Sequence, residues 1–304
     1  MNQSIQIVLA PSILGLKPTG VELLAASLIN AGLVQALESR SPIIEIPTPN
    51  DRYSTVRDGE TQCLNAFFLR EYSIILADAI SEQIKIGKLP IVFGGDCSIL
   101  LGNMLALKSH GEYGLVFLDA HADYYLPSES PTGEVADMDL AIATGRGPDL
   151  LTNINGLKPY VKLENVIHIG QRDGAEVEKY GSQDIRRTAM KCFDLESIRT
   201  NELDNILAGI LAIMSPSPLR CWLHFDTDVI SDEENPAVDY RLPGGLSFLE
   251  AEQILKVLMQ TGKIVGISVT IFNPTLDLSG SIAKRICACL SAAMISSSGQ
   301  KQHP

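Results

Sequence analysis

The sequence predicts a single α/β domain, residues 1–304, built on a mostly parallel sheet. Short apolar runs typical of buried strands alternate with segments of helical periodicity, which is the order that parallel sheets require. The 304 residues, of which 45% are hydrophobic and 20% charged, can bury a large core without dividing. Polar residues of the kinds that do chemistry follow directly after several apolar runs. Because ligands bind at the carboxyl ends of strands in such sheets, we expect a site there.

The first third of the chain is expected to supply two strands and two helices. Residues 1–11 lack the basic head and cleavage site of a signal peptide, so they predict the first core strand and a cytoplasmic location. Residues 21–37 have helical periodicity, and residues 42–47 form a short apolar run bounded by prolines, which predicts a second strand. Residues 71–88 have apolar side chains at helical spacing. This alternation favours a parallel sheet.

A third strand is predicted at residues 89–93, and it runs into Gly94 and Gly95. Two glycines permit a tight turn, and the residues that follow, 98–107, have a helical pattern. Cys97 therefore lies between the end of a strand and the start of a helix. A helix N-terminus lowers the pKa of a thiol and a nearby cation lowers it further, so we expect a lowered pKa at Cys97.

The strongest chemical signal follows the apolar run of residues 116–118. Asp119, His121 and Asp123 alternate there along an extended chain, so their side chains project from one face. Two carboxylates and an imidazole at the end of a buried strand would leave charge unpaired unless a cation lies among them. This spacing indicates a metal site.

A second apolar run, residues 221–225, ends in the same way. Asp226 and Asp228 share one face of the strand, and His224 shares it two residues deeper. His224 is assigned either to packing below the site or to a ligand or supporting role. Four aspartates and one histidine form an oxygen-rich set that suits Mn²⁺ or Mg²⁺. Two cations with shared carboxylates are the simplest interpretation, and they would activate a water for attack on an electrophilic carbon or phosphorus.

The remaining segments are assigned by composition. Residues 124–148 are rich in proline, glycine and acidic residues and are expected to form a pocket wall that determines substrate specificity. Residues 166–170 predict another strand, in which His168 is a core residue. Residues 282–295 predict a helix, and residues 296–304 a frayed tail.

Composition argues against several classes of partner. The formal net charge of −12 disfavours nucleic acid and anionic membranes, because both need a cationic face. No run approaches the roughly 18 apolar residues of a membrane-spanning helix. The six cysteines have neither the paired spacing of a disulfide framework nor that of a zinc knuckle. Nucleic acid, anionic membranes and a disulfide framework are therefore disfavoured.

Three ordered motifs in this chain resemble those of the ureohydrolase superfamily, which contains arginases, agmatinases and formiminoglutamases. The motifs are residues 94–98 (Gly-Gly-Asp-Cys-Ser), 119–123 (Asp-Ala-His-Ala-Asp) and 224–228 (His-Phe-Asp-Thr-Asp), followed by 236–237 (Pro-Ala) and 243–247 (Pro-Gly-Gly-Leu-Ser). The agreement extends over about residues 90–275. The resemblance implies a three-layer α/β/α sandwich, a binuclear manganese centre at the strand ends, hydrolysis of a guanidino or formimino C–N bond, and a homo-oligomer.

The resemblance also implies six ligands for the two manganese ions. They are Asp119 and Asp226 on both ions, His121 and Asp228 on one, and Cys97 and Asp123 on the other. Asp123 would in addition be the catalytic residue that takes up the proton of the attacking water and passes it toward the leaving amine. The family has a histidine where this chain has Cys97. A thiolate favours Zn²⁺ or Fe²⁺ over Mn²⁺, and the alternative is an inert thiol beside a single metal.

The positions that hold the substrate in the family are mostly changed. Its contacts with the amino-acid head of the substrate fall on Tyr125 and Thr132, and its proton-shuttling histidine falls on Ala136. The glutamate that pairs with a guanidinium in arginases and agmatinases falls on Ile271, which cannot balance that charge in a desolvated pocket. The carboxylates that could substitute are Glu134, Asp137, Asp139 and Asp239. We predict Tyr125, Thr132 and Asp239 as substrate-binding residues.

The expected function is metal-dependent hydrolysis of a linear C–N bond in a guanidino-, hydroxyguanidino- or formimino-type small molecule. A hydroxyguanidine has a lower pKa than a guanidine and needs no buried carboxylate, which fits Ile271. One alternative is a catalytically impaired member that acts as a binding or scaffold subunit, because the histidine ligand, the shuttle and the glutamate are all replaced. A zinc enzyme of the deacetylase type is less favoured, because an Asp-x-Asp pair prefers harder metals.

Overall fold

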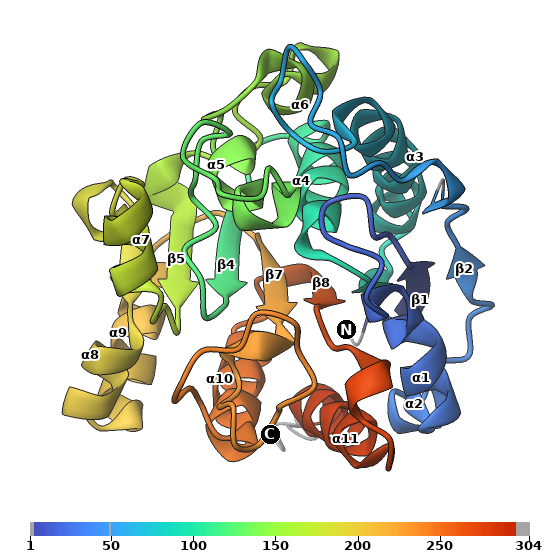
Figure 1. Cartoon of the computed structure of the whole chain (residues 1–304). Coiled ribbons are helices and arrows are strands. Elements are labelled where there is room, and N and C mark those ends of the chain that lie inside the picture. Colours follow the sequence, from blue (N-terminus) through green and yellow to red (C-terminus); the bar gives the residue numbers. More distant parts are fainter. Residues whose placement is uncertain (1–2, 49, 296–304) are drawn as a thin grey trace, which may run out of the picture.

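The computed structural model describes residues 3–48 and 50–295, and its centre is one β-sheet (Figure 1). In these residues the sheet has eight strands, and all neighbouring strands run parallel. The strands are β1 (Ile5–Ala10), β2 (Ile44–Glu45), β3 (Leu89–Gly94), β4 (Gly114–Leu118), β5 (Val166–Ile169), β6 (Lys191–Phe193), β7 (Cys221–Asp226) and β8 (Ile264–Thr270). The predicted α/β class is confirmed. The predicted tail, residues 296–304, lies outside the described residues.

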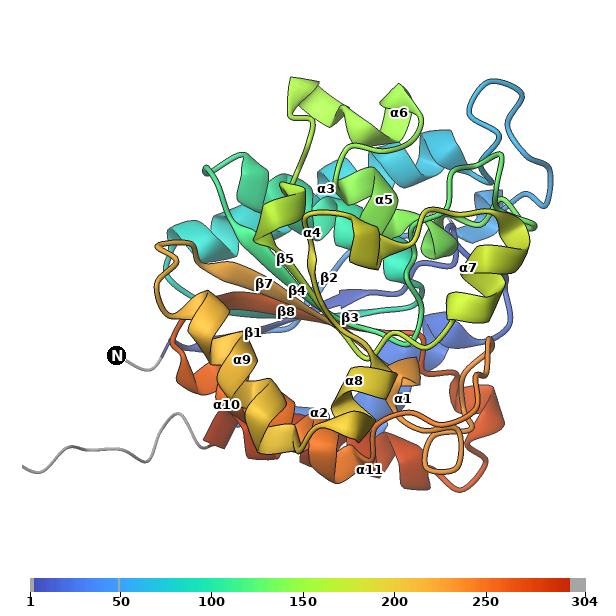
Figure 2. The ribbon, with the colours of Figure 1, turned by 90° about the vertical axis from the view of Figure 1, so that its left-hand side faces the viewer.

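Helices cover both faces of the sheet, so the fold is a three-layer α/β/α sandwich (Figures 1 and 2). The helices are α1 (Leu24–Asn30), α2 (Leu33–Ala36), α3 (Ala66–Lys85), α4 (Leu100–Lys108), α5 (Asp139–Ala143), α6 (Asp149–Thr152), α7 (Gly174–Tyr180), α8 (Leu195–Thr200), α9 (Leu203–Met214), α10 (Phe248–Gln260) and α11 (Ser281–Ile295). Helices α3 to α6 pack on one face, and α1, α2 and α8 to α11 on the other. None of the described helices is long and apolar enough to cross a membrane.

The strand order decides where the polar strand ends meet. It is β2-β1-β3-β8-β7-β4-β5-β6, so β3, β8, β7 and β4 are neighbours at the centre. Because parallel strands end at the same edge of a sheet, the residues that follow these four strands come together there. Segments more than a hundred residues apart in sequence thus form one site.

Trp222 fixes the register of β7 against β8 below that site. Its side chain is fully buried, and its Cα partner on β8 is Gly266. A Cβ atom at Gly266 would lie 2.0 Å from the Trp222 ring, so only glycine leaves room for the indole. The indole nitrogen donates to Ser268 Oγ at 2.9 Å, which satisfies the buried polar atom.

Three predicted elements have different bounds in the structure. The segment 21–37 is not one helix, because a 3₁₀ turn at Val21–Leu23 precedes α1 and Gly32, with φ 97°, breaks the chain before α2. The strand predicted at 42–47 is reduced to Ile44–Glu45 at the sheet edge, where flanking prolines lack backbone donors. The helix predicted at 71–88 begins earlier, at Ala66, and ends at Lys85.

Candidate metal centre

Neighbouring strands deliver the candidate donors to one edge of the sheet. Cys97 follows β3 and opens the 3₁₀ turn Cys97–Ile99. Asp119 follows β4, and Asp226 ends β7. Asp96 caps the 3₁₀ turn, since its carboxylate accepts a hydrogen bond at 2.8 Å from the amide two residues later. Local hydrogen bonding thus fixes the turn, while the strand order brings the donors together.

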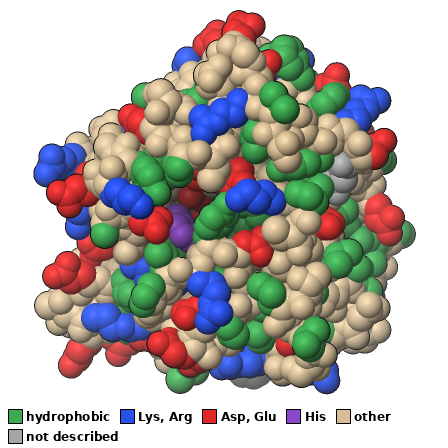
Figure 3. All heavy atoms as spheres, viewed as in Figure 1, with side chains coloured by type: hydrophobic (Ala, Val, Ile, Leu, Met, Phe, Trp, Pro, Cys, Tyr) green, Lys and Arg blue, Asp and Glu red, His purple; other side chains and the backbone are tan. Residues whose placement is uncertain are grey.

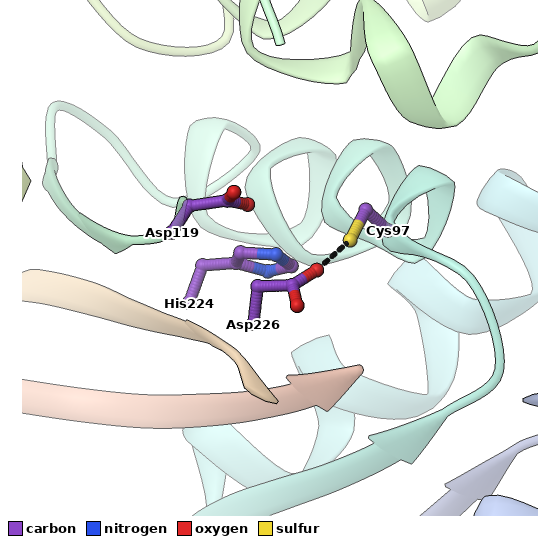
Figure 4. Close-up of side chains that lie close together, drawn as sticks. All are labelled: Cys97, Asp119, His224 and Asp226. Carbon is purple, nitrogen blue, oxygen red and sulfur yellow. Dashed lines mark hydrogen bonds between the residues drawn. The ribbon is translucent and has the colours of Figure 1, made fainter. Parts of the chain in front are cut away.

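The first donor group combines a thiol, an imidazole and two carboxylates (Figure 4). Its members are Cys97, Asp119, His224 and Asp226; all are buried, and one ligand atom of each lies within 4.8 Å of the others. Cys97 Sγ donates to Asp226 Oδ2 at 2.6 Å. Asp119 Oδ2 is buried and has no hydrogen-bond partner among the described residues. A bound cation would satisfy such an oxygen.

The second donor group shares Asp119 with the first. It consists of Asp119, His121 and Asp228. His121 Nδ1 lies 2.9 Å from Asp228 Oδ2 and 3.7 Å from Asp119 Oδ1. The backbone amide of His121 also donates to Asp119 Oδ1 at 2.7 Å, which orients the carboxylate. Asp119 therefore lies between the two groups, where a bridging carboxylate was predicted.

The other predicted ligands are distributed differently from the prediction. Among the described residues, Asp226, the second predicted bridge, belongs to the first group alone, and Asp123 belongs to neither. Asp123 lines the pocket beside both groups. Its backbone is left-handed, with φ 45°, a conformation that aspartate tolerates. His224, rather than Asp123, lies with Cys97 in the first group.

Burial and crowding shift the pKa values of these carboxylates. Burial and the charge of Asp228 raise the pKa of Asp119 to about 6. Burial and the charges of Asp228 and Asp119 raise the pKa of Asp226 well above its ordinary value. Burial, the largest single effect, acts in the same direction on Asp228, but the charge and hydrogen bond of His121 and the charge of Arg172 together outweigh it and hold the pKa of Asp228 below its ordinary value. Divalent cations would relieve the repulsion, so charge and donor chemistry both fit metal ions.

The thiol of Cys97 corrects an expectation from the sequence. The start of a helical turn predicts a lowered pKa, but burial raises the pKa of Cys97 well above its ordinary value, and the charges of Asp226 and Asp119 add to this effect. Burial also disfavours the charged form of His224 and lowers its pKa to about 3, so its imidazole is neutral. A neutral imidazole keeps one ring nitrogen free to bind a cation.

Residues on and after β5 support the two loops that carry the donors. His168, predicted as a core residue, is fully buried, and its Nε2 lies 2.8 Å from the carbonyl oxygen of His121. Asp173 accepts a hydrogen bond at 2.9 Å from the amide that follows His121. Arg172 donates to the carbonyl oxygen of Asp228 at 2.8 Å. These contacts hold the loops in position.

Four of the donors, Cys97, His121, Asp226 and Asp228, line a pocket with acidic, aromatic and apolar walls. Figure 3 shows a hollow on the face viewed in Figure 1, bordered by acidic and hydrophobic side chains. Tyr125 and Thr132, predicted from the sequence, line this pocket. Tyr180 and Tyr240 line it as well, and the sequence analysis missed both because neither belongs to a motif. Of the segment predicted as the wall, residues 124–148, the part between Tyr125 and Asp137 lines the pocket, and the helix α5 follows it in the same segment.

Glu134 and Asp239 are not free to meet a guanidinium. Glu134 lines the pocket, but its carboxylate lies 3.2 Å from Lys17 Nζ and accepts a hydrogen bond at 2.7 Å from the Tyr240 hydroxyl. Asp239, predicted to bind substrate, is not among the residues that line the pocket. Its carboxylate accepts a hydrogen bond at 2.7 Å from the side-chain amide of Asn273. Asp239 therefore supports the loop that precedes Tyr240.

The wall next to the first donor group is apolar. Ile271 is 5% exposed and packs in one cluster with Leu16, Ala136 and Cys97, all of which line the pocket. Its φ of 71° is left-handed, which is rare and strained for a β-branched residue. The Ile271 amide donates to the carbonyl oxygen of Gly95 at 2.9 Å, and this bond helps to hold the strained turn.

Asp137 should make the metal-free chain less stable as pH rises. Burial raises its pKa to about 7, although hydroxyls of Ser130 and Thr132 donate to it at 2.6 and 3.2 Å. The folded chain therefore holds a proton that the unfolded chain releases near pH 4, so this stabilisation is lost between about pH 4 and pH 7. We expect Asp137→Asn to remove about 1 kcal/mol or more of the difference in unfolding free energy between pH 5 and pH 8. Urea unfolding in EDTA at a series of pH values measures this difference. If the unfolding free energies of parent and variant changed with pH in parallel, the prediction would be contradicted.

The whole site lies inside a region that matches a known family. A family model described as "Arginase family" matches residues 27–296. The chain belongs to the arginase family. The match includes both donor groups and the strands that carry them, and it confirms the resemblance seen in the motifs. The chain is therefore a hydrolase of the ureohydrolase type.

Individual relatives agree with this assignment. The arginase of Brevibacillus brevis is 31% identical over 296 residues, which cover 96% of this chain and 98% of the relative. The solved structure of the arginase from Bacillus caldovelox has a TM-score of 0.84 at 24% identity and covers 99% of this chain and 100% of its own. The formimidoylglutamase of Bacillus subtilis has a TM-score of 0.73 at 16% identity, covering 98% of this chain and 88% of its own. These two structures show a shared fold.

Proposed function

We propose that this arginase-family chain hydrolyses a linear C–N bond in a guanidino-, hydroxyguanidino- or formimino-type small molecule, with a hydroxyguanidine as the best fit. The observation that carries this choice is the apolar wall of Ile271 and Ala136 beside the donors. A guanidinium placed against that wall would be desolvated without a counter-charge, which costs several kcal/mol. A hydroxyguanidine has a lower pKa than a guanidine, so it loses its proton at a much smaller cost and can then lie against the wall without an unpaired charge.

The described residues supply the groups that such a hydrolysis needs. Divalent cations held by the two donor groups would lower the pKa of an attacking water. Manganese suits the group of Asp119, His121 and Asp228. Asp123 lies in the pocket beside both groups, and burial and the charge of Asp119 raise its pKa well above its ordinary value. A carboxylate with a raised pKa is suited to accept the water's proton and deliver it to the leaving amine.

The outer pocket is suited to the polar head of the substrate. Tyr125 and Thr132 line one side, and Glu176, exposed in the first turn of α7, lines the pocket near Tyr180. An acidic and hydroxyl-rich rim favours an amino group over a second carboxylate. We therefore place the reacting C–N group at the donors and an amine-bearing head at the rim.

A substrate panel tests this proposal. We expect purified, manganese-loaded protein to release urea or ammonia from a hydroxyguanidino compound with a kcat/KM about tenfold or more above that for the matching guanidino compound, because the unpaired charge disfavours the latter. Formimino compounds complete the panel. Preference for the charged guanidine would contradict the assignment of the apolar wall, and no product from any member would contradict hydrolysis of this bond type.

A second candidate function is a binding or scaffold subunit, which the replacements at Cys97 and Ala136 favour. Metal content per chain distinguishes the two. Two cations in the parent support a hydrolase. If the parent holds one cation or none, and a second cation appears only in the Cys97→His variant, then Cys97 disables the site. That result supports the binding subunit.

A further inference from the structure

The ring of His224, for which the sequence left open packing or a ligand or supporting role, lies in the first donor group. It projects from β7 on the same face as Asp226, two residues before it, and it is fully buried. Figure 4 shows the ring between the Asp119 and Asp226 carboxylates, with Cys97 opposite. The sheet thus supplies an imidazole to the donor group in which Cys97 replaces the histidine of the family motif.

The surroundings of His224 leave one ring nitrogen for the donor group. The ring stacks on Phe117, with centroids 4.7 Å apart and planes 13° apart, which fixes its orientation. Nδ1 lies 2.9 Å from Ser268 Oγ, whose position is also held by the Trp222 indole. If Nδ1 carries the proton and donates it to Ser268, the lone pair of Nε2 faces the donor group.

Three of the donor atoms, that nitrogen among them, surround the hydroxyl oxygen of Thr270. The hydroxyl oxygen of Thr270 lies 3.4 Å from His224 Nε2, 3.3 Å from Cys97 Sγ and 3.3 Å from Asp226 Oδ2. Asp119 adds a buried oxygen, Oδ2, that has no partner among the described residues. One sulfur, one nitrogen and two oxygens therefore converge, and the unpartnered oxygen independently indicates a cation.

We propose that His224 Nε2 is a metal ligand and that it forms, with Cys97, Asp119 and Asp226, a four-donor site for a zinc-like cation. This inference rests on the proposed function, because it concerns one of the two cations that the hydrolase would use. A mixed sulfur, nitrogen and oxygen set with four members is typical of Zn²⁺, whereas Mn²⁺ prefers oxygen. The centre would then hold two unlike cations, zinc at His224 and manganese at His121.

X-ray absorption at the zinc edge tests the ligand set directly, with the full chain loaded with one equivalent of zinc and excess manganese. We expect the parent to show one sulfur and one imidazole per zinc. His224→Asn keeps a donor near Ser268 but has no atom at Nε2, so we expect it to lose the imidazole signal and bind zinc about tenfold or more weakly. Cys97→Ser is the reciprocal variant, and it should lose the sulfur signal and keep the imidazole.

Each outcome separates the ligand assignment from the proposed function. The four-donor site is overturned if the imidazole signal at zinc persists in His224→Asn, or if the zinc of the parent has no sulfur ligand. In either case the protein could still hydrolyse compounds of the substrate panel, so the proposed function would stand. A parent that binds one zinc, with one sulfur and one imidazole, and no second cation keeps the four-donor site and overturns the two-cation hydrolase. Melting curves in EDTA show whether the His224→Asn variant is folded. If the variant does not fold, the X-ray absorption spectrum of the parent still determines the ligand set.

Discussion

Asp226→Asn is expected to abolish hydrolysis and, in the metal-free chain, to increase stability. Asp226 ends the central strand β7, and its carboxylate contacts Cys97 Sγ at 2.6 Å and the Asp228 amide at 2.8 Å. Asparagine keeps the shape and one acceptor but removes the charge that a cation needs. We expect activity to fall by about three orders of magnitude or more, since two-metal chemistry depends on both cations.

The gain in stability of Asp226→Asn has the same physical origin as the loss of activity. Burial and the charges of Asp228 and Asp119 disfavour the ionised form of Asp226 in the folded chain. Removing that charge should raise the unfolding free energy of the metal-free chain by about 1–3 kcal/mol at pH 8.

Calorimetry in EDTA and mass-spectrometric metal content measure the two effects of Asp226→Asn. Asp204→Asn, at an exposed carboxylate in the first turn of α9, is the control: it should leave metal content unchanged and, through the helix dipole, lower stability by less than about 1 kcal/mol. Full metal content in Asp226→Asn would remove Asp226 from the ligand set. A metal-free variant less stable than its parent would show that repulsion does not dominate at this position.

Ile271→Glu is expected to shift the substrate preference toward charged guanidines. The side chain lies in the apolar wall with Leu16, Ala136 and Cys97, so a carboxylate there would be desolvated and would pair with a guanidinium. We expect the ratio of kcat/KM for guanidine over hydroxyguanidine to rise about tenfold or more. The free enzyme should lose about 1–3 kcal/mol of stability because the new charge is unpaired.

Ile271→Gln is the matched control for that change. Glutamine has nearly the same size as glutamate and faces the same strained backbone, with φ 71°, but it has no charge. The preference should therefore shift only in the glutamate variant. If the ratio of kcat/KM shifted equally in both variants, the shape of the wall, and not its lack of charge, would determine the selectivity.

Residues close in sequence were enough to predict the fold and part of the site. Asp119 and His121 follow a short buried strand, and their spacing places them together whatever the rest of the chain does. Asp226 and Asp228 are likewise fixed locally, because the Asp228 amide donates to the Asp226 carboxylate at 2.8 Å. Repeated alternation of strand and helix likewise predicted the parallel sheet, because it depends on local periodicity.

Other features depend on residues distant in the sequence. A helical turn predicts a lowered pKa for Cys97, but burial beside Asp226, 129 residues away, raises it. Tyr240 reaches Glu134 across 106 residues, and no motif marks that contact.

By itself, the sequence determined the fold class, the strand ends that carry carboxylates, and the loss of the glutamate at Ile271, because each of these follows from local pattern or from one position. Only the tertiary structure decided that His224 faces Cys97 and that Asp239 turns to Asn273. The physical reason is the strand order: β8 lies between β3 and β7, and β7 adjoins β4. This arrangement brings side chains from separate parts of the chain within bonding distance, and no local spacing encodes it.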